Sequence, residues 1–253
     1  VLQAEALGDG RLHYGKVWLI MSGKHISSQF DSELNAISTR VMEMGGVVEL
    51  QLRTAISALS EMDIDAANNV IELEAEVNNF ELELDHDISS IIGRRQPTAR
   101  DLRLLMAMSR TTGNLERAGD EVTKMARMVQ SIIQSGEARS LPTSELRSAS
   151  ELASGLPRKS LDAIARLDIH MALSIIKEDD LIDQEYNGFL RKLMTYIMED
   201  PRTISASLNL LFLAKAIERV GDHAKNIAES TIYVVKGEDV RHSSLESVES
   251  LVK

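Results

Sequence analysis

The chain carries nearly the same short sequence twice, and this repeat constrains its fold more than any other feature. Residues 114–126 read NLERAGDEVTKMA, and residues 216–228, which begin 102 positions later, read AIERVGDHAKNIA. Both copies contain the pattern E-R-x-G-D, in which Glu and Asp stand four positions apart. A period of this length is longer than that of solenoid repeats. The repeat therefore predicts a duplicated domain rather than an array of small units.

Apolar residues recur at steps of three and four along most of the chain, a spacing typical of helices with one buried face. The predicted helices cover residues 31–59, 63–93, 98–135, 143–167, 168–199 and 203–236. The two halves align, since Asp63 corresponds to Asp168 and Pro97 to Pro201. Long helices joined by short breaks pack as antiparallel neighbours. We therefore expect an all-α fold made of two tandem, sequence-related three-helix bundles.

The predicted domain boundaries follow the breaks between these helices. Repeat 1 covers residues 24–136, repeat 2 covers residues 142–237, and the segment SGEARSLP links them. Residues 238–253 form a polar C-terminal tail in which we expect a short helix. Residues 1–23 show no lasting helical period. We interpret them as an N-terminal extension that is disordered or was added upstream of a natural start at Met21.

Composition excludes several classes of function. The chain has 39 acidic and 28 basic residues, so its net charge of −11 repels nucleic-acid phosphates and suits cations or basic protein surfaces. It has no cysteine, which excludes disulfides, thiolate metal sites and a cysteine nucleophile. No apolar run approaches the length of about 18 residues that spans a membrane. The motifs of serine hydrolases, nucleotide-binding loops and HExxH peptidases are missing, so we expect no enzyme.

The repeated motif places two carboxylates on one side of a helix. Residues four apart face the same way, so Glu116 lies beside Asp120, and Glu218 lies beside Asp222. Carboxylate oxygens so arranged suit a hard cation such as Mg, Ca, Mn or Fe. If the second and third helices of each half pack together, acidic oxygens from two helices converge, as in bundle metal sites. The accessory positions on the second helices are Glu74, Asn78, Asp179 and Asp183.

Three other interpretations stay open. The acids form an ordinary solvated face, in which each motif aspartate pairs with a lysine one turn later, Lys124 or Lys225. Alternatively, the chain is a carboxylate-bridged metal oxidase or a metal-storage bundle. Glu83 and His86 then supply the Glu-x-x-His element of such proteins, although it occurs only once. In the third interpretation the chain is a purely structural helical scaffold.

Glycine and proline inside the predicted helices mark expected irregularities. Gly119 and Gly221 recur in the two motifs, although a mid-helix glycine costs about 1 kcal/mol relative to alanine. We interpret their recurrence as the close approach of another backbone. The pair Gly45-Gly46 in the first helix predicts a bend or a close helix contact. Pro157 predicts a kink or a split near the middle of the fourth helix.

Several stretches together resemble one known family: HISSQFDSEL, MGGVVELQL, RRQPTARDLRLLM, LERAGD, DQEY, LMTYIMEDPRTI and IERVGD. From about Lys24 to His242 the chain closely resembles PhoU, a family of bacterial phosphate-signalling regulators. The resemblance implies a cytoplasmic, commonly dimeric protein that negatively regulates the phosphate-starvation response and modulates phosphate uptake. It also implies contacts with the ATPase subunit of the phosphate ABC transporter and with a sensor histidine kinase, which hold the protein at the membrane only through these partners.

The resemblance further implies metal binding at the repeated acidic faces. Some members of the family bind iron, zinc, manganese or magnesium at E-x-x-x-D pairs, which carry over to Glu116/Asp120 and Glu218/Asp222. The accessory positions on the preceding helices contribute further oxygens. Asn78 stands where we expect an acid from the second half. Because an amide is a neutral and weaker ligand, we expect the first half to hold metal less readily.

Overall fold

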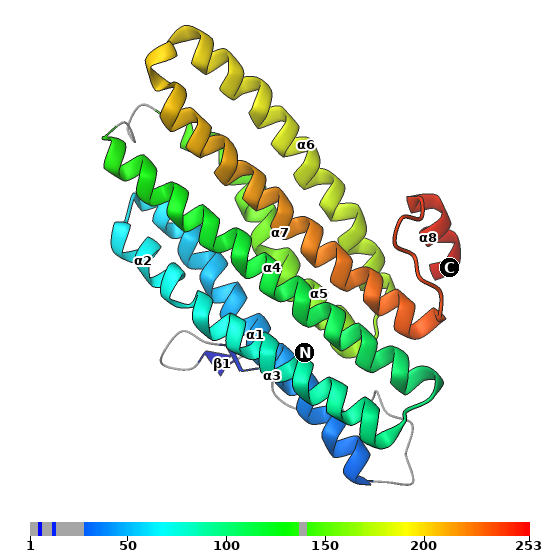
Figure 1. Ribbon diagram of the computed structural model, residues 1–253. Coiled ribbons are helices and arrows are strands. Elements are labelled where there is room, and N and C mark those ends of the chain that lie inside the picture. Colours follow the sequence, from blue (N-terminus) through cyan, green and yellow to red (C-terminus); the bar gives the residue numbers. More distant parts are fainter. Residues whose placement is uncertain (1–4, 7–11, 14–27, 137–140) are drawn as a thin grey trace.

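The computed structural model describes residues 5–6, 12–13, 28–136 and 141–253. Helices account for nearly all of these residues, as the apolar periodicity predicts (Figure 1). A pair of two-residue antiparallel strands, β1 (Glu5–Ala6) and β2 (Leu12–His13), precedes them. In chain order the helices are α1 (Ser28–Glu61), α2 (Ile64–Glu72), α3 (Glu74–Arg95), α4 (Ala99–Ser135), the 3₁₀ turn η3 (Thr143–Leu146), α5 (Arg147–Arg166), α6 (Ile169–Glu199), the 3₁₀ turn η4 (Pro201–Thr203), α7 (Ile204–Lys236) and α8 (Leu245–Val252).

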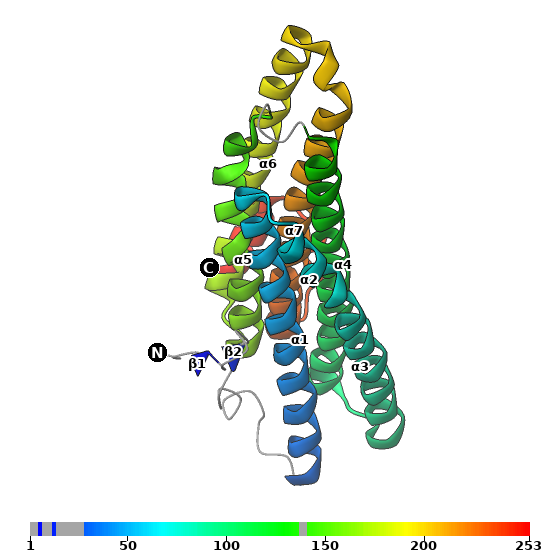
Figure 2. The same cartoon turned by 90° about the vertical axis from the view of Figure 1, so that its left-hand side faces the viewer.

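The two halves pack side by side through the helices that carry the motif. α4 and α7 share the most extensive interface between helices and lie along the centre of the molecule (Figure 1). They run in opposite directions, because Asn114 of α4 contacts His223 of α7, whereas the later Glu121 contacts the earlier Arg219. α1 and α5 also contact each other, and α3 and α6 pack on the outer sides of α4 and α7 (Figure 2).

The helix limits agree with the predicted ones to within a few residues, with two exceptions. Asp63 and Asp168 begin the second helix of each half, where the Oδ1 of each accepts hydrogen bonds from two backbone N–H groups of the first turn. The predicted helix 63–93 divides at Leu73 into α2 and α3. α5, in contrast, runs unbroken through Pro157, so the predicted split is wrong. A proline removes one backbone donor, and here the rest of the helical ladder persists.

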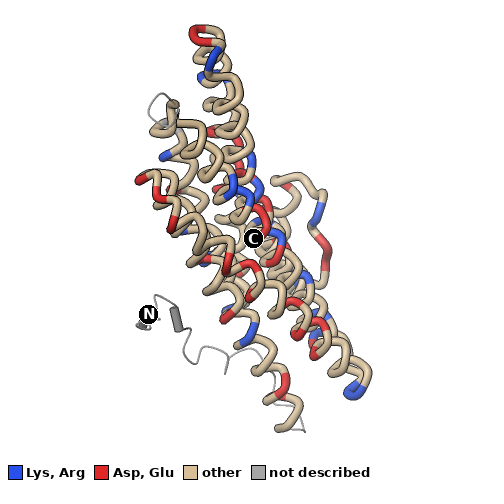
Figure 3. Tube along the Cα trace, turned by 60° about the vertical axis from the view of Figure 1, so that its left-hand side comes forward, with Lys and Arg blue, Asp and Glu red and all other residues tan. Residues whose placement is uncertain are grey.

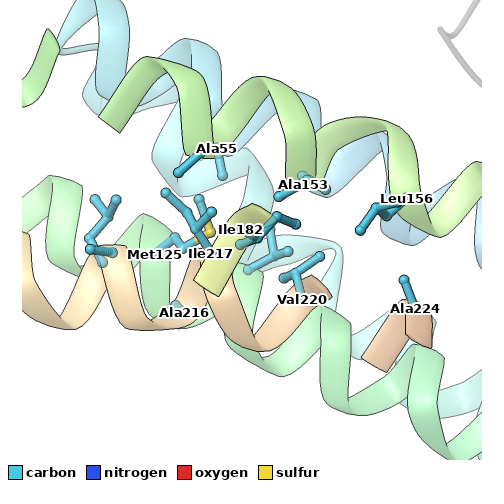
Figure 4. Packing of buried hydrophobic residues seen from close by; sticks show 14 of the residues in the cluster. Ala55, Met125, Ala153, Leu156, Ile182, Ala216, Ile217, Val220 and Ala224 are labelled. Carbon is cyan, nitrogen blue, oxygen red and sulfur yellow. The ribbon is translucent and has the colours of Figure 1, made fainter. Parts of the chain in front are cut away.

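The hydrophobic core extends across both halves. Side chains from α1, α4, α5, α6 and α7 meet in one cluster, part of which Figure 4 shows with the labels Ala55, Met125, Ala153, Leu156, Ile182, Ala216, Ile217, Val220 and Ala224. The many alanines allow the helices to approach closely. Gly45 of α1 allows the closest approach, because a Cβ there would lie 2.2 Å from Leu161 Cδ1 of α5. The close helix contact predicted from the glycine pair is therefore confirmed.

The C-terminal tail folds back onto α6, and the short helix predicted there is confirmed as α8. Val248 and Val252 are buried, and Glu249 pairs with Lys177 of α6 at 2.5 Å. Most of the predicted N-terminal extension lies outside the described residues, which include only β1 and β2 of this segment.

None of the helices in the described part of the chain has both the length and the apolar character needed to cross a membrane.

Candidate metal-binding faces

The first acidic face lies between α3 and α4. Glu116 and Asp120 stand one turn apart on α4, and both are partly exposed. Burial raises the pKa of Glu116, and the negative charges of Asp120 and Glu81 raise it further. Burial and the charge of Asp85 likewise raise the pKa of Glu81, although Arg117 opposes this rise. Among the described residues, neither Glu116 nor Asp120 has a hydrogen-bond or ion-pair partner on its carboxylate.

The second acidic face lies between α6 and α7 and contains an ion pair whose acid is buried. Asp179 of α6 is 1% exposed, and Lys225 Nζ of α7 donates a hydrogen bond to its Oδ2 at 3.0 Å. Burial raises the pKa of Asp179 to about 6, although the hydrogen bond and the charge of Lys225 act in the opposite direction. The Asp179 carboxylate therefore depends on Lys225 to remain charged near neutral pH.

Glu218, Asp222 and Asp183 complete the second face. Burial raises the pKa of Glu218, and a hydrogen bond from Lys215 Nζ at 2.6 Å opposes the rise. Burial and the charge of Asp222 raise the pKa of Asp183. Glu218 Oε2 is buried without a hydrogen-bond partner in the described part of the molecule. An unsatisfied carboxylate oxygen costs free energy that a bound cation would recover.

The motif glycines show which positions of the two halves correspond. A Cβ on Gly119 would lie 3.3 Å from Val77 Cγ1, and a Cβ on Gly221 would lie 2.9 Å from Asp179 Oδ1. Both glycines lie at a close helix contact, but the predicted approach of another backbone is wrong, because the nearest atoms belong to side chains. Val77 and Asp179 therefore occupy equivalent places, separated by the same 102 positions as the two motifs.

This correspondence assigns the accessory carboxylates differently from the sequence prediction. At the same spacing, Asp183 corresponds to Glu81, whereas the prediction paired it with Asn78. Asn78 is exposed on α3. Glu74 forms an ion pair with Arg127 of α4 at 2.9 Å. The first half thus places an acid beside its motif pair, but this acid is not one of the predicted residues.

A difference in spacing explains why Glu81 escaped the prediction. Asp63 and Val77 are 14 positions apart, whereas Asp168 and Asp179 are 11 apart. The interruption at Leu73 takes up the three additional residues, so a correspondence counted from the start of the helix fails beyond it. Counting backwards from the motif glycines would have identified Glu81.

The lysines of the motifs do not pair with the motif aspartates. Lys124 pairs with Glu121 at 2.9 Å, and Lys225 pairs with Asp179 of the neighbouring helix. The interpretation as an ordinary solvated face paired each lysine with the motif aspartate of its own helix, and both of these pairings are wrong. The His223 Nδ1 lies 3.2 Å from Asn114 Oδ1, and burial lowers the pKa of His223. This neutral histidine contributes to the contact between the halves.

The two faces supply suitable donors without a preformed ligand cage. In the described part of the chain, no three His, Asp or Glu side chains converge closely enough to hold a metal ion. Acidic and basic positions are interleaved along the helices (Figure 3). Carboxylate oxygens suit hard cations, and Glu218 Oε2 is unsatisfied. The donor set therefore fits a divalent cation, provided that side chains rotate toward it.

Comparison with known proteins decides the family. The profile of the PhoU domain matches residues 41–129 and again residues 146–231. The chain belongs to the PhoU family. The two matches confirm the predicted duplication, and each PhoU domain carries one acidic face.

Individual PhoU proteins resemble the chain over most of its length. A phosphate-specific transport system accessory protein PhoU homolog from Burkholderia is 43% identical, over 90% of this chain and 97% of its own. The accessory protein PhoU of Escherichia coli K12 is 46% identical, over 90% of this chain and 94% of its own. The crystal structure of PhoU from Pseudomonas aeruginosa, 40% identical, gives a TM-score of 0.80 and covers 83% of this chain and 100% of that chain.

Proposed function

We propose that this protein is a non-enzymatic, cytoplasmic negative regulator of phosphate uptake and of the phosphate-starvation response. The observation that carries the proposal is its identity of 43% and 46%, over 90% of the chain, with proteins named as phosphate-specific transport system accessory proteins. An accessory role in phosphate transport follows from these names. That the protein represses rather than activates the response is inferred from the family resemblance.

The proposed mode of action is protein contact, in the form of a homodimer, with the transporter's ATPase subunit and a sensor histidine kinase. The region where η4 joins the end of α6 to the start of α7 supports a role in protein contacts. Met194, Met198 and Phe212 are 57%, 81% and 60% exposed there. Large apolar side chains gathered on a surface mark interaction sites more often than chance.

The regulatory proposal is tested by deleting the gene and measuring phosphate uptake and a phosphate-responsive reporter. We expect the deletion strain to express the reporter even when phosphate is plentiful, and the wild-type gene to restore repression. Unchanged uptake and unchanged reporter activity in the deletion strain would contradict the proposal. Co-purification of the full-length protein with the ATPase subunit or the kinase tests the proposed partners separately.

We also propose that the two acidic faces bind divalent cations, with iron, zinc, manganese and magnesium as candidates. Glu116 and Asp120, together with Glu81, would hold the first ion. Glu218 and Asp222, together with Asp183, would hold the second. A bound ion would supply positive charge that lowers the mutual repulsion of these carboxylates and offers open coordination positions to a partner.

The cation proposal is tested by elemental mass spectrometry on the full-length protein without a histidine tag. We expect bound metal to fall when Glu116→Gln/Asp120→Asn or Glu218→Gln/Asp222→Asn is introduced. The matched control is Glu83→Gln/Asp87→Asn, which removes an equally spaced pair on α3 that is already bound by Arg40. Equal metal content in all folded variants would contradict the proposal and leave the regulatory one intact.

No observation in the described part of the chain favours the metal-oxidase or metal-storage alternative. His86 belongs to the one Glu-x-x-His element in the sequence and is exposed on α3. Glu83 of the same element is paired with Arg40. An oxidase site needs such residues to face the interior of the bundle.

A further inference from the structure

A cavity lies where the end of α1 meets η3 and the first turns of α5, away from both acidic faces. Its volume is about 470 Å³, within the range of roughly 300–1,000 Å³ that is usual for small-molecule sites. The last turns of α1 and the start of α5 lie side by side at this point (Figure 2). Its apolar lining comes from α1 and η3, and its polar lining includes Ser60, Thr143, Ser144, Arg147, Ser150 and Glu151.

Ser150 is the polar group of this cavity that the fold leaves unsatisfied. The residue is 2% exposed, and its Oγ has no hydrogen-bond partner among the described residues. Other helical serines of the chain, such as Ser154 and Ser160, donate to a backbone carbonyl one turn earlier. A buried hydroxyl without a partner costs free energy, and a ligand or a water in the adjoining cavity would recover it by accepting the hydrogen bond once the Ser150 side chain rotates toward the cavity.

Arg147 brings a positive charge to the same wall, one turn before Ser150. It is exposed and has no hydrogen-bond or ion-pair partner within the described part of the chain. Its guanidinium presents donors in a planar arrangement that matches the oxygens of a carboxylate or a phosphoryl group. The hydroxyls of Thr143 and Ser144 stand beside it in η3 and add further donors.

We propose that this cavity binds the phosphoryl group of a small phosphorylated molecule. Arg147 holds two phosphoryl oxygens, and the hydroxyl groups of Ser144 and Ser150 donate to the remaining ones. Glu151 shares the wall and repels a bare dianion, but it accepts a hydrogen bond from a hydroxyl of an organic part. A cavity of about 470 Å³ also exceeds what a single phosphate ion fills. The chemistry therefore favours a phosphate ester of a polyol over free phosphate.

The test is isothermal titration calorimetry on the full-length protein in the presence of a metal chelator, with glycerol 3-phosphate, inorganic phosphate and glycerol as probes. We expect saturable binding of glycerol 3-phosphate at one site and none of glycerol. Saturable binding of inorganic phosphate with the same residue dependence would also support the site and would identify free phosphate as its source. Absence of saturable binding by both phosphate probes would overturn the proposal.

Two substitutions locate the binding. Arg147→Gln should weaken it at least tenfold, whereas Arg166→Gln, which removes an exposed arginine at the other end of α5, should leave it unchanged. Ser150→Ala should weaken it severalfold and leave the Tm of the free protein equal or higher, because the unsatisfied hydroxyl is gone. A lower Tm with unchanged affinity would give Ser150 a structural role and overturn its assignment as a ligand.

A further variant separates this proposal from the one on metal binding. Glu218→Gln/Asp222→Asn changes an acidic face and leaves the cavity intact. It should bind glycerol 3-phosphate as the wild type does, whatever its metal content. Loss of phosphate binding in this variant would place the ligand at the acidic face and would overturn the cavity site.

Discussion

The two halves of the molecule share the same motif, but the buried contact beside it is uncharged in the first half and charged in the second. In the first half, Val77 and Thr123 are buried side chains without charge. At the corresponding positions of the second half, the buried Asp179 forms an ion pair with the partly exposed Lys225. The motif glycines keep the helices close in both halves. The duplicated fold therefore depends on the shape of the helix contact, while the polarity of that contact can change between the two copies.

The more exposed parts of the two acidic faces also differ in whether a lysine pairs with the motif glutamate. Lys215 neutralises Glu218 in the second half, and Gly113 stands at its equivalent position in the first. Glu116 therefore keeps no lysine at hydrogen-bond distance, whereas the second face already carries cations of its own. We infer that the first face is the more open to an external cation, although the sequence predicted the opposite from Asn78.

The largest expected effect comes from breaking the ion pair between Asp179 and Lys225. Lys225→Thr should lower the free energy of unfolding by about 3 kcal/mol at pH 7.5, because it leaves the Asp179 carboxylate buried without a counter-charge. The double variant Asp179→Val/Lys225→Thr copies the first half and should recover most of the loss. Urea unfolding monitored by circular dichroism gives both values. Equal losses in the single and double variants would contradict the assigned correspondence.

The two halves should also differ in how their stability depends on pH, because of the acid at position 229 of the second half. Glu229 corresponds to Arg127 in the first half, and burial raises the pKa of Glu229 from 4.5 to about 7, although Lys225 and Arg241 oppose it while Asp239 adds to it. Because this acid binds its proton more tightly when folded, its contribution to stability is complete below about pH 4.5 and is lost as the pH rises through about 7.

Glu229→Gln should therefore be more stable than the wild type by roughly 2 kcal/mol at pH 8, with the difference disappearing near pH 4.5. Urea midpoints measured across this range test the prediction. Glu74→Gln, which removes the partner of Arg127, serves as the first-half control and should change the stability little, because ion pairs near the surface contribute little. A difference that stays constant with pH would be inconsistent with a titration of Glu229.

The two motif glycines should tolerate alanine unequally. Gly221→Ala places a Cβ 2.9 Å from Asp179 Oδ1 and 3.0 Å from Ile182 Cδ1, both held in a packed interface. Overpacking should outweigh the gain in helix propensity and cost about 1 kcal/mol. Gly119→Ala meets its neighbours at 3.2 and 3.3 Å and should be close to neutral. Thermal unfolding compares them, and a larger loss for Gly119→Ala would reverse the comparison.

The smallest expected effect concerns the affinity of the second face for cations. Lys215→Met removes the ammonium group that donates to Glu218 and should tighten Mn²⁺ binding there about fivefold, equivalent to roughly 1 kcal/mol. Lys177→Met, which removes a lysine paired with Glu249 of α8, is the control. Mn²⁺ titration followed by electron paramagnetic resonance measures both. Unchanged affinity in Lys215→Met would mean that this lysine does not compete with the metal.

Much of the fold could be predicted from the sequence because it depends on local spacing. The helices followed from apolar steps of three and four, and Asp63 and Asp168 marked helix starts through their capping side chains. The duplication followed from the repeated motif, which also located the two acidic pairs. In the first half the acid beside the motif pair is Glu81 rather than one of the predicted accessory residues, because the interruption at Leu73 shifts the positions that face α4.

The sequence by itself determined the all-α architecture, its duplication and the place of the motif carboxylates on one helix side, since each of these depends on periodicity within a segment. Only the tertiary structure decided which charges neutralise one another. Lys225 and Asp179 are 46 positions apart, and Glu121 and Arg219 are 98 apart. Such pairs depend on how helices pack, because a lysine within one turn of an aspartate can still reach a buried acid on the next helix. The cavity at Ser150 likewise exists only where two segments that are distant in the sequence meet, the end of α1 and the continuous stretch of η3 and α5.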